Sequence, residues 1–255
     1  MKELNYKQVE ETLITWLREK VKNAGCSGAV VGLSGGIDSA VTAVLCKKAF
    51  DSNFLGIIMP CYSSEQDAED AELLAREFKI NYITRDLSTA YDQLIQTFEP
   101  ENQEQSNINT EEKTNMAKAN IKPRLRMITL YYYAASHSYL VVGTDNWSEL
   151  TVGYFTKYGD GGIDLAPLGR LVKTEVKELA RHLGIPKKII NKKPSAGLWE
   201  GQTDEEELGI PYKKVDQYIL TGKADKRVKE RIDELAENNA HKTEPIPIPK
   251  RDILL

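Results

Sequence analysis

The sequence predicts an α/β fold in which a parallel β-sheet has helices on both faces. Short apolar runs rich in β-branched residues alternate with segments of helical periodicity through the first half of the chain. The runs show no alternation with polar residues, so both faces of each strand are expected to be buried, as in parallel sheets. In such sheets ligands bind beyond the carboxyl ends of the strands. The four strands are expected at 29–33, 54–59, 80–84 and 139–143.

Helical patterns precede and separate these strands. Apolar residues recur at helical spacing from Val9 to Val21, which predicts an amphipathic helix that ends before Gly25. Ser64 and Asp67 have the spacing of a capping box at the start of another helix. A polar run at 101–115 is expected to be a solvated loop. Helices between the strands are expected at 40–49, 65–78, 89–98 and 117–136.

The C-terminal part of the chain has a different pattern. Glycine, lysine and aspartate are dense at 157–162 and 191–203, which predicts loops, and short helices are expected at 173–183, 211–220 and 226–237. No internal repeat and no linker divides the chain. We therefore expect one domain spanning residues 1–255, which is long enough to bury a substantial core.

Composition and charge exclude several classes of protein. The chain has 34 Lys and Arg residues against 38 Asp and Glu residues, a formal net charge of -4, so nucleic acid is not an expected partner. The N-terminus lacks an apolar signal region, and no stretch approaches the ~18 apolar residues of a membrane span. A cytoplasmic location without a membrane partner is expected.

The three cysteines are Cys26, Cys46 and Cys61, and they are far apart with no Cys-x-x-Cys pair. This pattern argues against a disulfide framework and a zinc site, and favours reduced thiols that fill the core. A nucleophilic thiol is the alternative. It would need a partner base from among three histidines.

A glycine-rich segment at the end of the first expected strand is the clearest functional signal. Gly35 and Gly36 lack Cβ atoms, so backbone N–H groups can turn toward an anion at the start of the following helix, and serine hydroxyls can add donors. The segment lacks the lysine of a Walker A loop. An acid beside bound phosphates requires a divalent cation between them, so Asp38 argues against a glycine-rich turn without function. The residues of this phosphate loop are Gly32, Leu33, Ser34, Gly35, Gly36, Ile37, Asp38 and Ser39.

The segment from Ser34 to Ser39 resembles the SGGxDS loop of the ATP pyrophosphatases, which have a Rossmann-like adenine nucleotide alpha hydrolase fold. Within that group, the rest of the chain resembles the ammonia-dependent NAD synthetases. The most discriminating segment is GYFTKYGDGG at 153–162. The other matching segments are RLRM at 124–127, GTDNWSE at 143–149, Pro167-Leu168, Lys173, Pro194-Ser195, DEEELG at 204–209 and His241-Lys242.

The resemblance implies a ligase that forms a C–N bond. ATP would activate nicotinic acid adenine dinucleotide (deamido-NAD) as an acyl-adenylate, and ammonia would displace AMP to give NAD, with pyrophosphate as the other product, in the last step of NAD biosynthesis. Such chemistry needs positioning and charge stabilisation rather than a covalent nucleophile. A chain of 255 residues also leaves no room for an attached glutaminase domain, so free ammonia is the expected nitrogen donor.

The resemblance also implies roles for individual residues. Asp38 and Glu149 would bind Mg²⁺, and Asp160 and Lys173 would be catalytic. The ATP contacts would be the whole phosphate loop together with Thr144, Lys173 and Ser195. The deamido-NAD contacts would be Arg124, Lys157, Asp164, His241 and Lys242.

Each of these roles has a simpler alternative. Glu149 has the pattern of a surface acid on a helix, Lys173 that of a solvated lysine at a helix start, and Asp160 that of a turn-forming residue. The resemblance further implies a homodimer and a loop at 191–212 that closes over ATP. Ser195 stands where the family commonly has threonine, and the segment 101–115 has no counterpart.

Two other classes of function remain as alternatives. One is another ATP pyrophosphatase, such as a tRNA-thiolating or GMP-forming ligase, and the other is a nucleotide-binding sensor without catalysis. A tRNA enzyme would need a basic surface, which the net charge of -4 does not favour. A sensor would be free to lose Asp38, Glu149 or Lys173, and all three are present.

Overall fold

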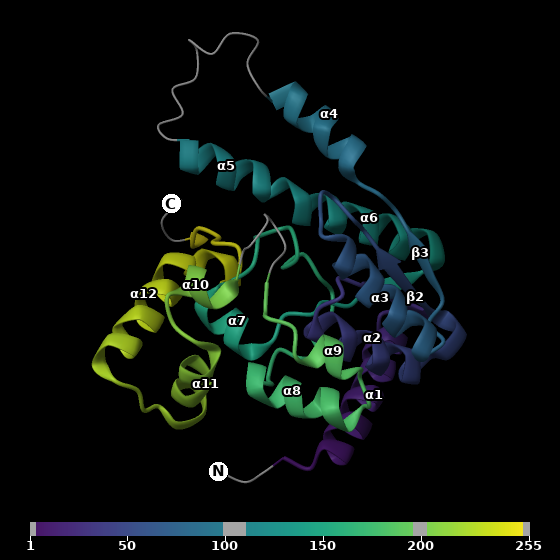
Figure 1. Cartoon of the computed structure of the whole chain (residues 1–255), viewed down its shortest axis with the longest axis horizontal. Coiled ribbons are helices and arrows are strands. Elements are labelled where there is room, and N and C mark those ends of the chain that lie inside the picture. The colour runs from purple at the N-terminus through teal and green to yellow at the C-terminus, as the bar shows by residue number, and fades with distance from the viewer. Residues whose placement is uncertain (1–3, 99–110, 196–202, 252–255) are drawn as a thin grey trace.

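The computed structural model describes residues 4–98, 111–195 and 203–251 of the chain. Four parallel strands form one sheet in the order β3-β2-β1-β4 (Figure 1). In register, Ala29 pairs with Phe54 and Leu140, and Gly56 pairs with Tyr82. The strands are β1 (Gly28–Gly32), β2 (Phe54–Ile58), β3 (Tyr82–Thr84) and β4 (Tyr139–Val141).

The strand order creates a switch point at the centre of the sheet. The chain runs outward from β1 to β2 and β3, and then crosses to the other side of β1 to form β4. Connections that leave β1 and β4 in opposite directions open a crevice at their carboxyl ends. The phosphate loop follows β1, and Thr144 and Asp145 follow β4, so these segments share that crevice.

Helices surround the sheet and continue as a separate group in the C-terminal part of the chain (Figure 1). Beyond the last strand, the described chain has no further strand and is built of short helices and loops. In order, the helices are α1 (Tyr6–Asn23), α2 (Ile37–Phe50), η1 (Asp51–Asn53), α3 (Glu65–Glu77), α4 (Ser88–Phe98), α5 (Glu111–Ala119), α6 (Ile121–His137), α7 (Trp147–Val152), α8 (Lys173–His182), α9 (Lys187–Ile190), α10 (Asp204–Leu208), α11 (Tyr212–Thr221) and α12 (Lys226–Thr243).

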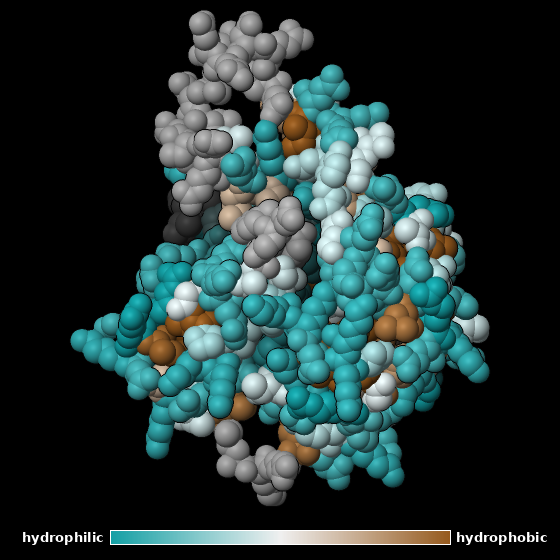
Figure 2. Space-filling view, viewed as in Figure 1, coloured by the Kyte–Doolittle hydropathy of each residue, from teal (hydrophilic) through white to brown (hydrophobic). Residues whose placement is uncertain are grey.

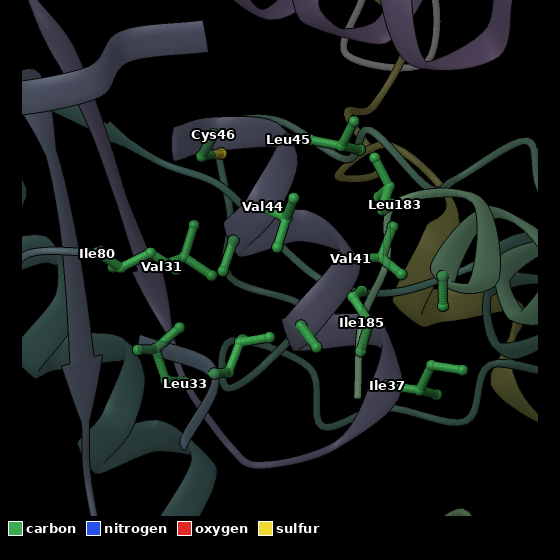
Figure 3. Packing of buried hydrophobic residues seen from close by; sticks show 14 of the residues in the cluster. Val31, Leu33, Ile37, Val41, Val44, Leu45, Cys46, Ile80, Leu183 and Ile185 are labelled. Atoms are coloured by element: carbon green, nitrogen blue, oxygen red, sulfur yellow. The ribbon is translucent and has the colours of Figure 1, made fainter. Parts of the chain in front are cut away.

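Alternate residues of the strands pack into two separate cores. Val30 and Ile57 face a cluster that includes Leu130 and Tyr133 of α6. On the other face, Val31 packs into a cluster with α2, which is buried along most of its length (Figure 3). Because successive side chains of a strand point to opposite faces, this division confirms the predicted parallel sheet covered on both sides.

A third apolar cluster lies away from the sheet and holds the C-terminal helices together. Val152 of α7 packs with Leu208, Val215 and Ile232, which come from α10, α11 and α12. The face of the molecule in Figure 2 is mostly hydrophilic, with hydrophobic residues scattered over it. Within the described residues, no helix is long and apolar enough to span a bilayer.

The region around the expected polar loop at 101–115 differs from the prediction. Residues 99–110 lie outside the described residues, and residues 111–115 begin α5 instead of continuing the loop. The single helix expected at 117–136 is split at Asn120 into α5 and α6. The split places Pro123 in the first turn of α6, where its missing N–H would have had no helical partner.

The N-terminal cap of α3 was predicted correctly at Ser64 but not at Asp67. The Ser64 hydroxyl accepts a hydrogen bond from the Gln66 N–H at 3.2 Å. The Asp67 carboxylate forms an ion pair with Lys192 at 2.6 Å, so a distant lysine engages the side chain that the capping box would have used. Of the cysteines, Cys46 and Cys61 are buried in the cores as expected, whereas Cys26 is half-buried.

Candidate active site

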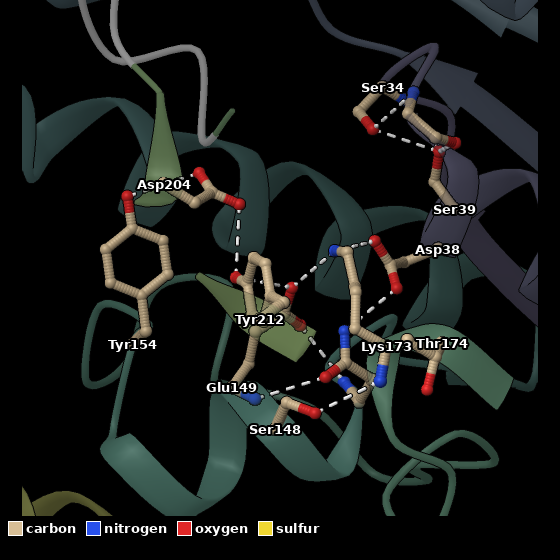
Figure 4. A network of polar contacts seen from close by, with 12 residues as sticks. Ser34, Asp38, Ser39, Ser148, Glu149, Tyr154, Lys173, Thr174, Asp204 and Tyr212 are labelled. Carbon is tan, nitrogen blue, oxygen red and sulfur yellow. Dashed lines mark hydrogen bonds and ion pairs between the residues drawn. The ribbon is translucent and has the colours of Figure 1, made fainter. Parts of the chain in front are cut away.

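The phosphate loop is shaped by hydrogen bonds between its own two serines (Figure 4). The Ser34 hydroxyl donates to Ser39 Oγ at 2.9 Å, and Ser39 Oγ donates to the Gly36 carbonyl at 3.0 Å. Gly35 has a φ of +75°, and a Cβ there would overlap the Asp67 carbonyl. The hydroxyls expected to bind phosphate therefore also fix the loop, and its conformation requires glycine at position 35.

A cavity of about 600 Å³ lies above the loop at the carboxyl end of the sheet. This volume is within the usual range for small-molecule sites. Part of the loop 191–212 borders the cavity through Lys192 to Ser195, and residues 196–202 lie outside the described residues. The predicted site residues that line it are Gly32, Leu33, Ser34, Gly36, Ile37, Asp38, Ser39, Thr144, Glu149, Asp160, Lys173, Ser195 and Lys242.

An ion-pair cluster centred on Lys173 lines this cavity, and Figure 4 shows its contacts. Lys173 Nζ lies 2.6 Å from Asp38 Oδ2 and 2.9 Å from Glu149 Oε1. The lysine is only 4% exposed, so it is not the solvated helix-start residue of the simpler interpretation. Three helices, α2, α7 and α8, each bring one charged group from their first turns to this point.

Asn146 holds both carboxylates in place. Its side-chain amide donates to Asp38 Oδ1 at 2.9 Å, and its backbone N–H donates to Glu149 Oε2 at 3.1 Å. Asn146 also caps α7, because its side-chain oxygen accepts from the Glu149 N–H. Each carboxylate thus has one oxygen bound to Asn146 and the other directed at Lys173.

A second buried network fixes the start of α8. Asp216 on α11 accepts hydrogen bonds from the Ser148 hydroxyl at 2.6 Å and from the Thr174 N–H at 2.8 Å. Ser148 Oγ in turn accepts from the Lys173 N–H at 3.0 Å. The ring of Tyr212 packs against Lys173 Nζ, with 4.9 Å between the nitrogen and the ring centroid. The backbone and the side chain of Lys173 are therefore both held from the C-terminal helices.

Burial and neighbouring charges shift the pKa values of Lys173 and Glu149 in opposite directions. Burial alone would lower the pKa of the Lys173 ammonium, but the carboxylates of Asp38 and Glu149 outweigh it and hold that pKa above its usual value. Burial raises the pKa of Glu149, while Lys173 opposes the rise. Lys173 therefore stays protonated, and its positive charge offsets the cost of burying the carboxylates of Asp38 and Glu149.

The donors around Lys173 fit a magnesium ion bound together with ATP. Mg²⁺ prefers oxygen ligands and usually takes one or two carboxylates plus substrate phosphates. The carboxylates of Asp38 and Glu149 both point toward one position, which the ammonium of Lys173 occupies. In the described residues, no three His, Cys, Asp or Glu side chains come together to hold a metal by themselves, so phosphates would have to complete the coordination.

The glycine-rich turn at 157–162 places Asp160 on the cavity wall. Asp160 Oδ1 accepts from the Thr156 N–H at 2.8 Å, a bond typical of a turn-forming aspartate, and the residue remains accessible to solvent. Lys242 lines the same cavity, and its ammonium donates to the Gly153 and Phe155 carbonyls, each at 2.8 Å. The Asp160 side chain can therefore stabilise the turn and also face the cavity as a catalytic group would.

Four residues expected to contact the dinucleotide do not line this cavity. Arg124 is exposed and donates to the Lys157 carbonyl, and the Lys157 ammonium donates to the His241 carbonyl. Asp164 accepts from the Tyr131 hydroxyl at 3.0 Å and from the Val141 N–H at 2.8 Å. The structure brings Arg124, Lys157 and His241 into one chain of contacts, and it uses the Asp164 carboxylate to hold β4 against α6.

Several functional residues were missed by sequence reasoning. Asn146 could have been found, because Asn followed three residues later by Glu is a capping signal. Asp216 and Ser148 gave no such signal, since their roles depend on α11 packing against α7 and α8. Arg126 is a further cavity-lining cation, bound to the Met59 carbonyl and the Ser63 hydroxyl.

The parallel sheet, the switch point and the glycine-rich loop opening α2 define an enzyme of the adenine nucleotide alpha hydrolase type. The family model described as NAD synthase matches residues 9–246. The chain belongs to the NAD synthase family.

Individual relatives agree with this assignment. The chain is 50% identical over 246 residues to an NH(3)-dependent NAD(+) synthetase of Carboxydothermus hydrogenoformans, covering 96% of this chain and 98% of the relative. Among solved structures, an NMN synthetase of Francisella tularensis has a TM-score of 0.87 at 36% identity, with 97% and 99% of the two chains covered. An NH3-dependent NAD synthetase of Campylobacter jejuni has a TM-score of 0.76 at 31% identity, with 97% and 100% covered.

The network at Asp216 leads to a prediction about stability. Ser148 and Thr174 donate to different oxygens of Asp216, so the NH₂ group of Asp216→Asn would face one of these two donors, and we expect a loss of about 1–3 kcal/mol in the free energy of unfolding. Urea denaturation measures this loss. Asp233→Asn, at a half-exposed i,i+4 ion pair on α12, is the matched control and should stay within about 0.5 kcal/mol. Equal effects of the two substitutions would contradict a structural role for Asp216.

Proposed function

We propose that this chain converts deamido-NAD, ATP and ammonia to NAD, AMP and pyrophosphate, the last step of NAD biosynthesis. Family membership and relatives of nearly equal length support the reaction. The observation that carries the proposal for the site is the convergence of the phosphate loop, Asp38, Glu149 and Lys173 on one cavity of about 600 Å³.

In the first step, the nicotinate carboxylate attacks the α-phosphorus of ATP. A new O–P bond forms, the bond to the bridging oxygen breaks, and pyrophosphate leaves. Backbone N–H groups at the start of α2 bind phosphate oxygens, and the Lys173 ammonium stabilises the charge that develops on them. A bound Mg²⁺ held by Asp38 and Glu149 would neutralise phosphate charge and orient the leaving group.

In the second step, ammonia attacks the acyl carbon of the adenylate. The C–N bond forms, the C–O bond to the phosphate of AMP breaks, and the protons released by nitrogen pass to a carboxylate and then to solvent. Asp160 lines the cavity and carries an oxygen that accepts from the Thr156 N–H, so it is held in position to receive a proton. Residues from Lys192 to Ser195 border the cavity and would limit the access of water to the adenylate.

We further propose that the enzyme is a cytoplasmic homodimer that binds the dinucleotide partly through Arg124, Lys157, Asp164, His241 and Lys242. Support for a partner surface comes from α6, on which Ile128 is 59% exposed and Tyr132 is 67% exposed. Arg124 lies on the same helix outside the cavity, where a substrate bound between two subunits would reach it.

A second candidate substrate is the corresponding mononucleotide, nicotinic acid mononucleotide. The observation that favours it is the TM-score of 0.87 to an NMN synthetase, compared with 0.76 to the Campylobacter enzyme. The higher identity of 50% to a curated NAD synthetase favours the dinucleotide. The chemistry of the amidated carboxylate is the same in both, so the assignment depends on which substrate has the higher kcat/KM.

The decisive experiment supplies the purified chain with ATP, Mg²⁺ and ammonium, and with either the dinucleotide or the mononucleotide. We expect NAD and AMP in equal amounts, and a higher kcat/KM for the dinucleotide. ADP as the nucleotide product would exclude the proposed adenylation, and preference for the mononucleotide would reassign the substrate.

Lys173→Ala should lower kcat by roughly 10²-fold or more, because it removes a preorganised charge at the phosphates. Steady-state rates of AMP formation measure the effect. Lys177→Ala, one turn further along α8 and away from the cavity lining, is the control and should keep nearly normal activity. A near-normal rate for Lys173→Ala would remove this lysine from the mechanism.

Asp38→Asn should raise the Mg²⁺ concentration needed for half-maximal activity by about 10-fold or more, because a neutral amide is a weaker ligand for a hard cation than a carboxylate. Magnesium titrations of AMP formation at saturating ATP measure this concentration. If the variant has the wild-type magnesium requirement, Asp38 is not a metal ligand.

A further inference from the structure

Lys192 connects three separate parts of the chain beside the phosphate loop. Its ammonium lies 2.6 Å from Asp67 Oδ1 and 2.8 Å from Asp70 Oδ2, both on α3, and it donates to the Gly35 carbonyl at 3.4 Å. An ammonium has three N–H donors, so these three acceptors use all of them. Lys192 lines the cavity, yet each of its donors is directed at a protein acceptor.

Asp67 brings a carboxylate to the edge of the phosphate loop. Its backbone lies so close to Gly35 that a Cβ there would overlap the Asp67 carbonyl, and the residue lines the cavity. Within the described residues, Lys192 is the only ion-pair partner of this carboxylate. Without Lys192, an uncompensated negative charge would remain beside the site proposed for the phosphates of ATP, and it would repel them.

Asp70 fixes the position of the Lys192 ammonium. The residue is 1% exposed, and its Oδ1 atom accepts from Gln66 at 3.2 Å and contacts Lys188 Nζ at 2.8 Å. Burial alone would raise the pKa of Asp70, but the hydrogen bonds from Lys188 and Lys192 outweigh it and hold that pKa below its usual value. The ionised carboxylate therefore holds the ammonium of Lys192 next to Asp67.

We propose that Lys192 is a positioning residue for ATP, because it holds the Asp67 carboxylate in an ion pair beside the turn at Gly35 and so allows the phosphate loop to accept a polyphosphate. The inference rests on the proposed function and adds a residue to the site. The Lys192 ammonium has no donor left for a substrate, so it acts through Asp67 and Gly35 and not as a catalytic group.

The test measures the binding of an ATP analogue that the enzyme does not cleave. Lys192→Met removes the ammonium and keeps a long unbranched side chain. We expect the Kd of α,β-methylene-ATP, measured by calorimetry with Mg²⁺ present, to rise about 10-fold or more, the usual effect of disturbing one charged contact. Adenosine carries no phosphate, so its Kd should stay within about 3-fold of wild type. A variant that only loosens the site would weaken both ligands equally.

Asp67→Asn tests whether the charge of Asp67 causes the loss. The amide has nearly the same shape and no charge, so the single variant should bind the analogue within about 3-fold of wild type. Lys192→Met combined with Asp67→Asn should recover most of the affinity that Lys192→Met loses, since the two residues are in contact and their effects should not add. Lys192→Arg keeps the positive charge and should bind the analogue more tightly than Lys192→Met.

Lys188→Met is the matched control. Lys188 contacts the same buried carboxylate, Asp70, but its side chain is 52% exposed on α9, and it is not among the residues that line the cavity. The Kd of the analogue should therefore stay within about 3-fold of wild type. Equal losses in Lys188→Met and Lys192→Met would show that the ion pairs of Asp70 serve the fold, and would overturn the inference.

The outcomes separate this inference from the proposed function. Unchanged binding of the analogue to a folded Lys192→Met variant, or failure of Asp67→Asn to restore it, would overturn the role of Lys192 and leave the synthetase assignment intact. If Lys192→Met does not fold, Lys192→Gln is measured in the same way, and failure of both to fold would make the lysine a structural residue and overturn the inference. Wild-type protein that binds the analogue but forms no NAD would instead overturn the proposed function.

Discussion

The contact of the Lys173 ammonium with Asp38 and Glu149 is the interaction on which the rest of the site depends. A buried charge is tolerated only when it is paired, and here one lysine that is 4% exposed supports two carboxylates. Since the three residues lie in the first turns of three different helices, the ion pairs hold the starts of α2, α7 and α8 together. Removing the lysine would leave two acids facing each other, so folding and catalysis use the same contact.

The sheet determines where this cluster can form. The strand order β3-β2-β1-β4 puts the connections after β1 and β4 on opposite sides of one crevice, and the phosphate loop and the segment after β4 both end there. Behind them, the Asn146 side-chain amide donates to the Asp38 carboxylate, and the Asp216 carboxylate accepts from the Thr174 N–H, so that the charged groups keep their orientation without substrate. Such preorganisation is what lets a site stabilise a developing charge without rearranging.

The buried carboxylates Asp216 and Asp145 differ in how fully their oxygens are hydrogen-bonded. Asp216 accepts two hydrogen bonds and serves the packing of α11 against α8. Asp145 lines the cavity and is buried to a similar degree, but its Oδ2 has no partner among the described residues. The contrast separates a carboxylate that stabilises the fold from one that leaves a buried oxygen unsatisfied.

The sequence by itself determined the features that depend on neighbouring residues along the chain. The strands, the amphipathic α1, the glycine-rich loop and the helix that it opens all follow from local periodicity and from the absence of Cβ atoms, and each was predicted within a few residues. The start of α5 at 111–115 was missed because the polar composition of 101–115 indicated a loop, and the break at Asn120 was missed because 117–136 was predicted as one continuous helix. Only the tertiary structure decided the partners of the polar side chains, which pair Asp67 with Lys192, Asp164 with Tyr131 and Asp216 with Ser148. The physical reason is that hydrogen bonds and ion pairs depend on distances of a few ångströms between segments far apart in the chain, and those distances are set by packing around the sheet.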